Sequence, residues 1–462
     1  MMEKLLDKVL KKVKPKKDDQ EELREVAEEL LEKAGEIIDD KGLDVTPMLV
    51  GSAARGTWLK GEKDIDIFLL FPEESPRSKL EERGLELARE IAEGKGTEQF
   101  AEHPYLTANI EGFDVDIVPC YDIKNPSKLR SAVDRSPHHQ EYVKGQLTPE
   151  LTDQVLLLKG FLRGIGVYGA ELRIHGFSGY LAELLIIHFE SFQDLIQNAK
   201  KWKEGQIIDF TQEYSTPEDV YRMFPDQPLI VIDPVDPSRN VAAAVSEKNF
   251  ATFVRACEDL DRNPNEKFFF LKPPDLSKKE IREFMKKRGT KIFTIVFDTP
   301  SDLVPDIIYP QLRKTERTLI QRLDRCNFKV LRSGVHSTPK KSVIVLELSV
   351  SELPKAYKHQ GPPLGVESDS FIQKHIESDQ KLAGPFIDSS GNLAFELGRE
   401  YSNAEEVIRD SLESRNGFGK HVAEAIGEGY ELAEGATVTK LIDDELKGFF
   451  SRYLTHCLPW YC

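Results

Sequence analysis

Hydrophobic and polar positions alternate with two different periods along the first part of the chain. Residues 18–40 (DDQEELREVAEELLEKAGEIIDD) place apolar side chains at helical spacing among many charges, which predicts a long amphipathic helix. Residues 45–52 (VTPMLVGS) and 64–72 (DIDIFLLFP) have the apolar character of strands. Residues 78–94 predict another helix, and residues 106–121 predict two strands joined by a Glu-Gly turn. This order of elements indicates a compact mixed sheet covered by helices.

The pattern changes near residue 150, where helical spacing takes over. Residues 152–166 (TDQVLLLKGFLRGIG) and 176–202 (GFSGYLAELLIIHFESFQDLIQNAKKW) are strongly apolar at that spacing. The second stretch is apolar around much of its circumference, so we expect it to be buried in a helical domain. Residues 228–246 predict a short buried strand, a proline-rich loop and the start of a helix. Residues 262–280, rich in Pro, Asn and Lys, predict a domain junction.

The chain beyond this junction predicts a second kind of sheet. Residues 290–300 predict a strand, residues 307–327 a helix, and residues 328–337 and 341–350 two further strands. Strand, helix, strand, strand is part of a ferredoxin-like pattern. Residues 355–370 (KAYKHQGPPLGVESDS) predict a loop, and the remainder mixes charged helices with short strands.

Composition and charge exclude several classes of protein. Hydrophobic residues make up 40% of the 462 positions, enough for several packed cores, and we find no apolar run long enough for a membrane span. The five cysteines are scattered without a C-x-x-C pair, so they predict unpaired thiols in a reducing cytoplasm rather than a zinc site or a disulfide framework. A net charge of −16 argues against indiscriminate nucleic-acid binding but leaves room for a local basic groove.

Two aspartates interrupt the apolar strand predicted over residues 64–72. Side chains alternate faces along a strand, so Asp64 and Asp66 share one face, about 7 Å apart. Asp114 and Asp116 share a face of a later strand in the same way. If the two strands pair, three or four carboxylates converge. Two Mg²⁺ ions could then bind, one activating a hydroxyl and one holding a leaving phosphate. A solvated strand face is the plainer interpretation of Asp-Ile-Asp taken alone.

A Gly-Ser turn precedes these aspartates. Gly51 permits close approach of the backbone, and Ser52 adds a hydroxyl donor where we expect a helix to begin. Arg55 lies one turn further on and carries a fixed positive charge. Backbone amides, a hydroxyl and a guanidinium suit the oxygens of a triphosphate. Together with metal ions and an activated hydroxyl, they predict nucleotidyl transfer.

The combination of Gly-Ser, Asp-x-Asp and a later strand aspartate resembles the nucleotidyltransferase superfamily, which includes poly(A) polymerases, oligoadenylate synthetases and CCA-adding enzymes. Successive blocks narrow the resemblance to the archaeal, class I CCA-adding enzymes. They lie in family order over roughly residues 49–246 and are GSAARGTWLKGEKDIDIFLLFP, AEHPYL, DVDIVPCY, SAVDRSP, LLLKGFLRGIGVYGAE, HGFSGYLAELL and DPVDPSRNVAAAVS. The rest of the chain resembles the family mainly in the arrangement of its elements.

The resemblance implies an α+β, multi-domain fold. Residues 1–148 would form a nucleotidyltransferase catalytic head with a polymerase-β-like palm. Residues 149–265 would form a helical neck that binds substrate, and residues 266–462 a ferredoxin-like body with a helical and mixed tail that binds tRNA. The block HGFSGYLAELL is interpreted as structural, with glycines for close helix packing and Ser178 as a helix cap.

The resemblance also implies roles for single residues. Asp64 and Asp66 would hold both Mg²⁺ ions, and Asp116 would hold the ion that activates the 3′ hydroxyl of tRNA. Asp64 stands where the family often has Glu, and Asp114 does not match a metal ligand of the family. The residues implied to contact the incoming nucleotide are Ser52, Arg55, His139, Lys159, Tyr168 and Arg239.

Several of these nucleotide contacts have a structural alternative. Lys159 and Tyr168 match phosphate contacts, yet a snorkelling lysine and a core aromatic are the alternatives. Arg239 matches an arginine near the base-recognition edge, but it could simply pair with an aspartate of its own loop. His139 matches a nucleotide-contacting histidine and could instead be an ordinary loop residue.

The activity that follows from the resemblance is addition or repair of the 3′-terminal CCA of tRNA from CTP and ATP, without a nucleic-acid template. Mg²⁺ is the implied cofactor, and tRNA, CTP and ATP are the implied partners, in the cytoplasm. The alternatives are a poly(A) polymerase or oligoadenylate-type enzyme and, from another class, a catalytically inactive RNA-binding protein. Basic clusters near residues 340 and 355 and over residues 278–291 are candidate tRNA contacts. The sequence leaves the oligomeric state open, a homodimer being one option.

Overall fold

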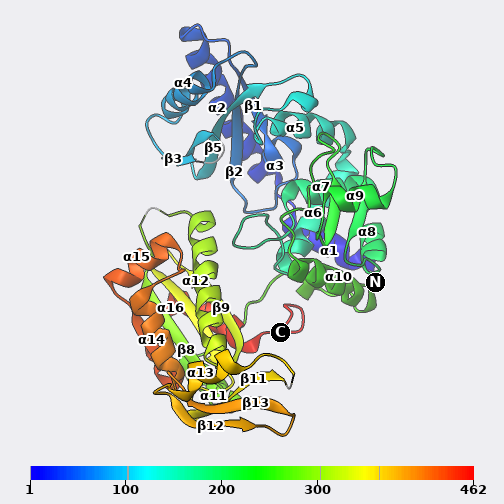
Figure 1. Ribbon diagram of the computed structural model, residues 1–462. Helices are drawn as coiled ribbons and strands as arrows, with labels where there is room; N and C mark the ends of the chain where they lie inside the picture. Colours follow the sequence, from blue (N-terminus) through cyan, green and yellow to red (C-terminus); the bar gives the residue numbers. More distant parts are fainter. Residues whose placement is uncertain (1, 101–102, 302, 364) are drawn as a thin grey trace. The chain divides into compact units, whose positions relative to one another are not determined.

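The computed structural model describes residues 2–100, 103–301, 303–363 and 365–462 (Figure 1). The first two residues of the AEHPYL block therefore lie outside the described residues. None of the helices in the described ranges is long and apolar enough to cross a membrane.

The chain forms two compact units. The first contains residues 1–272 together with 458–461, and the second contains residues 273–457 together with 462. The finer division of the chain into head, neck and body stays a prediction.

A five-stranded sheet begins the first unit. Its order is β1-β2-β5-β4-β3, and β2 and β5 are parallel neighbours while the other pairs are antiparallel. The strands are β1 (Thr46–Val50), β2 (Asp64–Pro72), β3 (Thr97–Phe100), β4 (Pro104–Ile110) and β5 (Phe113–Asp122). Glu111 and Gly112, both with positive φ, form the predicted turn between β4 and β5.

The two faces of this sheet differ in chemistry. Ile65 and Ile67 of β2 pack in one apolar core with the helices α2 (Lys17–Asp40) and α4 (Arg77–Ile91). Side chains alternate along a strand, so Asp64 and Asp66 project from the opposite face. The alternation that buries the isoleucines therefore keeps both carboxylates away from that core.

Helices pack around a second core in the same unit. Its centre includes Phe161, Phe177 and Phe253. The remaining helices and strands of the first unit are α1 (Met2–Val13), α3 (Gly51–Arg55), η1 (Pro126–Lys128), α5 (Arg135–Gln146), α6 (Pro149–Gly164), α7 (Gly179–Phe189), α8 (Phe192–Ala199), β6 (Gln206–Asp209), α9 (Pro217–Met223), β7 (Leu229–Ile232), α10 (Glu247–Arg262) and η2 (Glu266–Phe268). The apolar stretch 176–202 forms two helices, because Glu190 takes a left-handed φ of 63° and Ser191 caps α8.

The second unit contains the ferredoxin-like sheet. Its order is β14-β8-β10-β9, with all neighbours antiparallel, and two helical connections complete a β-α-β-β-α-β pattern. The elements are α11 (Lys278–Arg288), β8 (Lys291–Asp298), α12 (Pro305–Arg325), β9 (Val330–Ser337), β10 (Lys341–Leu348), α14 (Ala404–Ser414), α15 (Lys420–Glu428), β14 (Glu431–Glu434), η3 (Gly435–Lys440) and α16 (Asp444–Thr455). The α+β, multi-domain expectation is confirmed.

The loop predicted over residues 355–370 is wrong. Much of it forms β11 (Ala356–Pro363) and α13 (Asp369–Ile376). β11 pairs with β13 (Asn392–Gly398), which also pairs with β12 (Lys381–Ile387). β11 is rich in polar residues and proline, so its extended state depends on pairing with a strand far along the chain rather than on its own residues.

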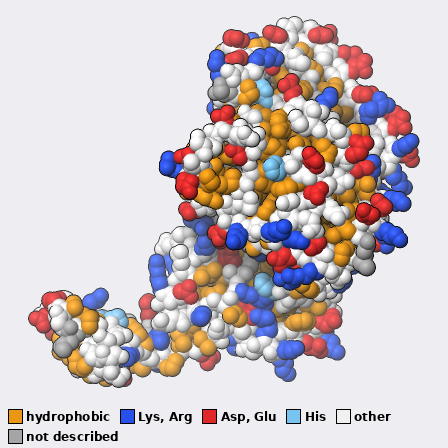
Figure 2. All heavy atoms as spheres, turned by 90° about the vertical axis from the view of Figure 1, so that its right-hand side faces the viewer, with side chains coloured by type: hydrophobic (Ala, Val, Ile, Leu, Met, Phe, Trp, Pro, Cys, Tyr) orange, Lys and Arg blue, Asp and Glu red, His pale blue; other side chains and the backbone are white. Residues whose placement is uncertain are grey.

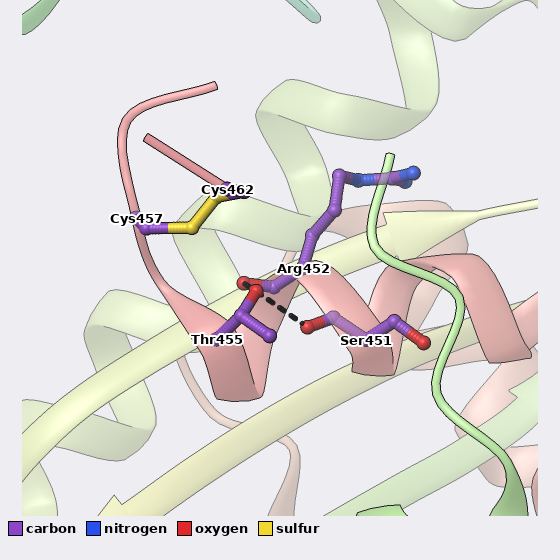
Figure 3. Close-up of a disulfide and its surroundings, with 5 residues drawn as sticks. All are labelled: Ser451, Arg452, Thr455, Cys457 and Cys462. Carbon is purple, nitrogen blue, oxygen red and sulfur yellow. Dashed lines mark hydrogen bonds between the residues drawn. A yellow bond between two sulfur atoms is a disulfide. The ribbon is translucent and has the colours of Figure 1, made fainter. Parts of the chain in front are cut away.

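The prediction of unpaired thiols is also wrong for one pair. Cys457 and Cys462, whose Cα atoms are 6.1 Å apart, form a disulfide just after α16 (Figure 3). His456 turns the chain there with a φ of 43°, beyond the last helical turn, in which Thr455 Oγ1 donates to the carbonyl of Ser451. Trp460 lies in the closed loop. It stacks on Phe268 and its Nε1 donates to Asp259 within the first unit.

Candidate active site

Four aspartates lie side by side where β2 and β5 pair. The parallel register sets Asp64 opposite Asp114 and Asp66 opposite Asp116. Neighbouring strands are about 4.8 Å apart, so Asp66 and Asp116 project together from the face opposite α2 and α4. The predicted pairing of these two strands is confirmed by the register, which sets Asp66 beside Asp116 and leaves Asp64 two residues away along β2.

Burial and mutual repulsion make these carboxylates hard to ionise. Burial raises the pKa of Asp66 to about 7, and the negative charges of Asp116 and Asp64 add to the rise. Burial also raises the pKa values of Asp64 and Asp116. Thr107 Oγ1 donates a 2.6 Å hydrogen bond to Asp116 Oδ1 and so orients that carboxylate. Such a cluster is stabilised by a bound cation.

The donor set fits a metal ion that is shared with a phosphate ligand. Among the residues that the structure describes, no three acidic, histidine or cysteine side chains converge closely enough to hold an ion by themselves. Mg²⁺ usually takes one or two carboxylates and completes its shell with phosphate oxygens and water. Asp66 and Asp116 supply such a pair, whereas Asp114 accepts a hydrogen bond from Asn109.

The close approach of the backbone to Asp66 requires glycine at position 51. Val50, the last residue of β1, pairs with Asp66, and Gly51 then opens α3 with a φ of 75°. A Cβ atom at Gly51 would lie 2.1 Å from Asp66 Oδ2. Glycine therefore allows the short helix that carries Ser52 and Arg55 to approach the carboxylate directly.

Arg55 is held by a buried glutamate that the sequence pattern did not single out. Glu183 Oε1 accepts a 3.0 Å hydrogen bond from Arg55 Nε, and Arg55 NH2 lies 3.0 Å from Oε2. Arg55 NH1 donates to Gln140 at 2.6 Å. Glu183 lies on α7 and is fully buried. It is the lone acid in the apolar helix GYLAELLIIHF, which is the signal that could have identified it.

Lys159 and Tyr168 meet at the first residue of α7. A Cβ atom at Gly179 would lie 3.4 Å from both Lys159 Nζ and the Tyr168 hydroxyl. Lys159 Nζ also donates to the carbonyl of Thr57 at 2.8 Å. Burial raises the pKa of Tyr168, so its hydroxyl is a neutral donor. Ser178 caps α7, as predicted, by accepting from the backbone N–H of Leu181.

His139 and Arg239 converge on Asp233. Asp233 Oδ2 lies 2.9 Å from His139 Nε2 and 2.8 Å from Arg239 NH1, and the Tyr180 hydroxyl donates to Oδ1 at 3.2 Å. Burial alone would raise the pKa of Asp233, but these partners hold it near 2. Burial lowers the pKa of His139. The pairing of Arg239 with an aspartate, the structural alternative, is therefore present.

A cavity opens beside Arg239. It has a volume of about 580 Å³, and its lining includes Ser178, Phe224 and Asn240. The Arg239 side chain is 35% exposed, so part of its guanidinium faces solvent while NH1 is bound to Asp233. The site residues thus form three groups, one around Asp66, one around Glu183 and one around Asp233, all within the first unit.

Three family models match successive parts of the chain. Residues 9–139 match the nucleotidyltransferase domain, and residues 153–270 match the second domain of tRNA nucleotidyltransferase. Residues 288–435 match the C-terminal domain of the CCA-adding enzyme.

Curated relatives match over nearly the whole length. The CCA-adding enzyme of Methanosarcina acetivorans is 40% identical over 96% of this chain and 97% of its own length. That of Methanothermobacter thermautotrophicus is 37% identical over 98% of this chain and 97% of its own length. That of Archaeoglobus fulgidus is 36% identical over 95% of this chain and 96% of its own length. The chain therefore belongs to the family of archaeal-type CCA-adding enzymes.

Proposed function

We propose that this chain adds or repairs the 3′-terminal CCA of tRNA from CTP and ATP, without a nucleic-acid template, and releases pyrophosphate. The observation that carries the proposal is the in-register pair Asp66 and Asp116 beside Gly51, in a chain of this family. The reaction is an in-line attack of the tRNA 3′ hydroxyl on the α-phosphate of the incoming nucleotide. It needs charge neutralisation and positioning rather than a covalent intermediate.

The proposed cofactor is Mg²⁺, held by Asp64, Asp66 and Asp116. When bound, the metal neutralises phosphate charge and eases ionisation of the attacking hydroxyl. Burial favours the protonated forms of Asp66 and Asp116, and a bound cation would oppose that effect. Thr107 keeps Asp116 oriented by donating to its Oδ1 atom.

The proposed triphosphate contacts come from two places in the first unit. Ser52 follows Gly51 at the start of α3, next to the carboxylates. Lys159 and Tyr168 lie together at the N-terminus of α7, where helix amides and the helix dipole favour anions. Arg55 links the two places, because its charge acts on Asp66 and its guanidinium binds Glu183.

Base selection is proposed to depend on His139 and Arg239. Cytosine and adenine each present an unprotonated ring nitrogen on the Watson–Crick edge, whereas uracil and guanine present an N–H there. The N–H groups of Arg239 that do not bind Asp233 can donate to the ring nitrogen of cytosine or adenine. They would leave the ring N–H of uracil or guanine without an acceptor, which is costly in a desolvated pocket. Asp233 holds Arg239 and His139 in fixed orientations for this purpose.

Binding of tRNA is proposed to depend on shape and local charge. Acidic and basic side chains are interspersed over the face that Figure 2 shows. A-form helices are recognised mostly by shape and by phosphate and 2′-hydroxyl contacts. The lysines of α11 remain candidate contacts in the second unit.

The test uses a tRNA transcript that lacks CCA. With CTP alone the enzyme should add two residues, and ATP should then add one. A-tailing of unrelated RNA would instead favour the poly(A) polymerase alternative. Asp116→Asn should abolish addition. Asp114→Asn, on the same strand face but bound to Asn109, is the matched control and should retain it.

A further inference from the structure

Glu183 is the common partner of two buried cations. Its carboxylate accepts from Arg55 at 3.0 Å and from the Thr57 hydroxyl at 2.5 Å, and Lys159 Nζ lies 3.8 Å away. The side chains of Glu183, Lys159 and Arg55 are 0%, 1% and 8% exposed. We call these four residues the Glu183 cluster. It joins α3, α6 and α7.

The position of Glu183 on α7 does not need a charge for packing. Its helical neighbours Leu181, Ala182, Leu184 and Leu185 are all buried and apolar. A carboxylate taken out of water is costly unless it is paired and hydrogen-bonded, and an apolar residue of similar size would often be equally stable there. A fixed charge at this position is therefore explained better by what it holds than by stability.

The geometry of the Glu183 cluster restricts both cations. Two contacts to one carboxylate fix the plane of the Arg55 guanidinium. Thr57 links Glu183 to Lys159, because its carbonyl accepts from Lys159 Nζ while its hydroxyl donates to Glu183. One carboxylate of the cluster thus holds two basic side chains beside the N-terminus of α7.

We propose that Glu183 is a positioning residue that fixes Arg55 and Lys159 for the triphosphate of the incoming CTP or ATP. This inference rests on the proposed function, because it assigns the two basic side chains to a polyanionic substrate. Burial lowers the pKa of Lys159, and the negative charge of Glu183 opposes that shift. Glu183 acts through its neighbours and need not touch the nucleotide.

The test compares Glu183→Gln with a matched variant, Glu347→Gln. Glu347 is fully buried in the second unit and accepts from Arg288, Thr290 and Arg332, so it reports the general effect of losing such a carboxylate. Glu183→Gln should raise KM for CTP and for ATP about tenfold or more, with KM for tRNA within about twofold of wild type. Glu347→Gln should leave both nucleotide KM values unchanged.

A folded Glu183→Gln variant with unchanged or lowered nucleotide KM would overturn the inference, since a merely structural or competing carboxylate predicts that result. Thr57→Val is a milder second variant that removes one donor to Glu183 and keeps every charge. It should raise the same KM values by a smaller factor, and an unchanged KM would also count against the inference. In a Lys159→Met background, Glu183→Gln should raise the nucleotide KM values by a smaller factor than it does in the wild type.

These outcomes are separate from the proposed function. If the wild-type enzyme failed to add C and A to the truncated tRNA, the proposed function would fail whatever the variants did. Normal CCA addition by the wild type, with normal nucleotide KM in Glu183→Gln, would contradict only the role of Glu183.

Discussion

Replacing Gly51 with alanine should lower both the stability of the fold and the rate of the reaction. Gly51 has a φ of 75°, a conformation that costs an L-residue about 1–2 kcal/mol. The added Cβ atom would also lie 2.1 Å from Asp66 Oδ2, where real contacts are essentially never under 3.0 Å. The carboxylate and α3 must therefore move apart by about 1 Å, and a displacement of that size can cost about 100-fold in rate.

Gly42→Ala is the matched control for the backbone term. Gly42 has a φ of 60°, and a Cβ atom built there meets nothing within 4 Å. Both variants should lose about 1–2 kcal/mol of unfolding free energy in urea titrations. Only Gly51→Ala should also lose about 100-fold in kcat for C addition.

The comparison has a clear failing result. If Gly51→Ala kept a kcat within about twofold of Gly42→Ala at saturating nucleotide and tRNA, close approach of α3 to Asp66 would not matter for the chemistry. The assignment of Asp66 to the reacting centre would then lose its geometric support.

Three further outcomes are expected. Burial lowers the pKa of His139, so below about pH 6.5 the unfolded chain binds a proton more readily than the folded chain does. The free energy of unfolding should therefore fall as the pH drops. Urea titrations at pH 7.5 and 5.5 should show a smaller fall in His139→Gln than in the wild type. Asp233→Asn should weaken the hold on the Arg239 guanidinium and reduce the ratio of kcat/KM for CTP to that for UTP by about tenfold or more. An unchanged ratio would contradict the role of Arg239 in base selection. Trp460→Ala should lower the free energy of unfolding by about 3–5 kcal/mol, because the indole is buried against Phe268. A loss below about 1 kcal/mol would show that the loop carrying Trp460 does not pack on Phe268 in solution.

The cluster of aspartates on one sheet face could be predicted from the sequence because its signals are local. The period-2 alternation of DIDIFLLF places Asp64 and Asp66 on one face, and the second alternating segment places Asp116 in the same way. The register that sets Asp66 beside Asp116 depends on how β2 and β5 pair in the folded chain. The alternation within each strand nevertheless allows few other pairings that keep the apolar face buried.

The residues that hold the site together could not be predicted in the same way. Glu183 and Asp233 meet their partners across large separations in sequence, so no local period reveals them. Glu183 is the lone acid of an apolar helix, a signal that indicates a buried partner without identifying it. β11 and the Cys457–Cys462 pair were missed because a distant strand and a turn, rather than their own residues, determine them.

The most direct test of the proposed metal site is anomalous diffraction from crystals grown with Mn²⁺ and a non-reactive CTP analogue. Manganese should lie between Asp66 and Asp116, with the triphosphate extending from Ser52 toward the N-terminus of α7. Manganese bound elsewhere, with the triphosphate away from both aspartates, would contradict the assignment of these carboxylates to nucleotidyl transfer.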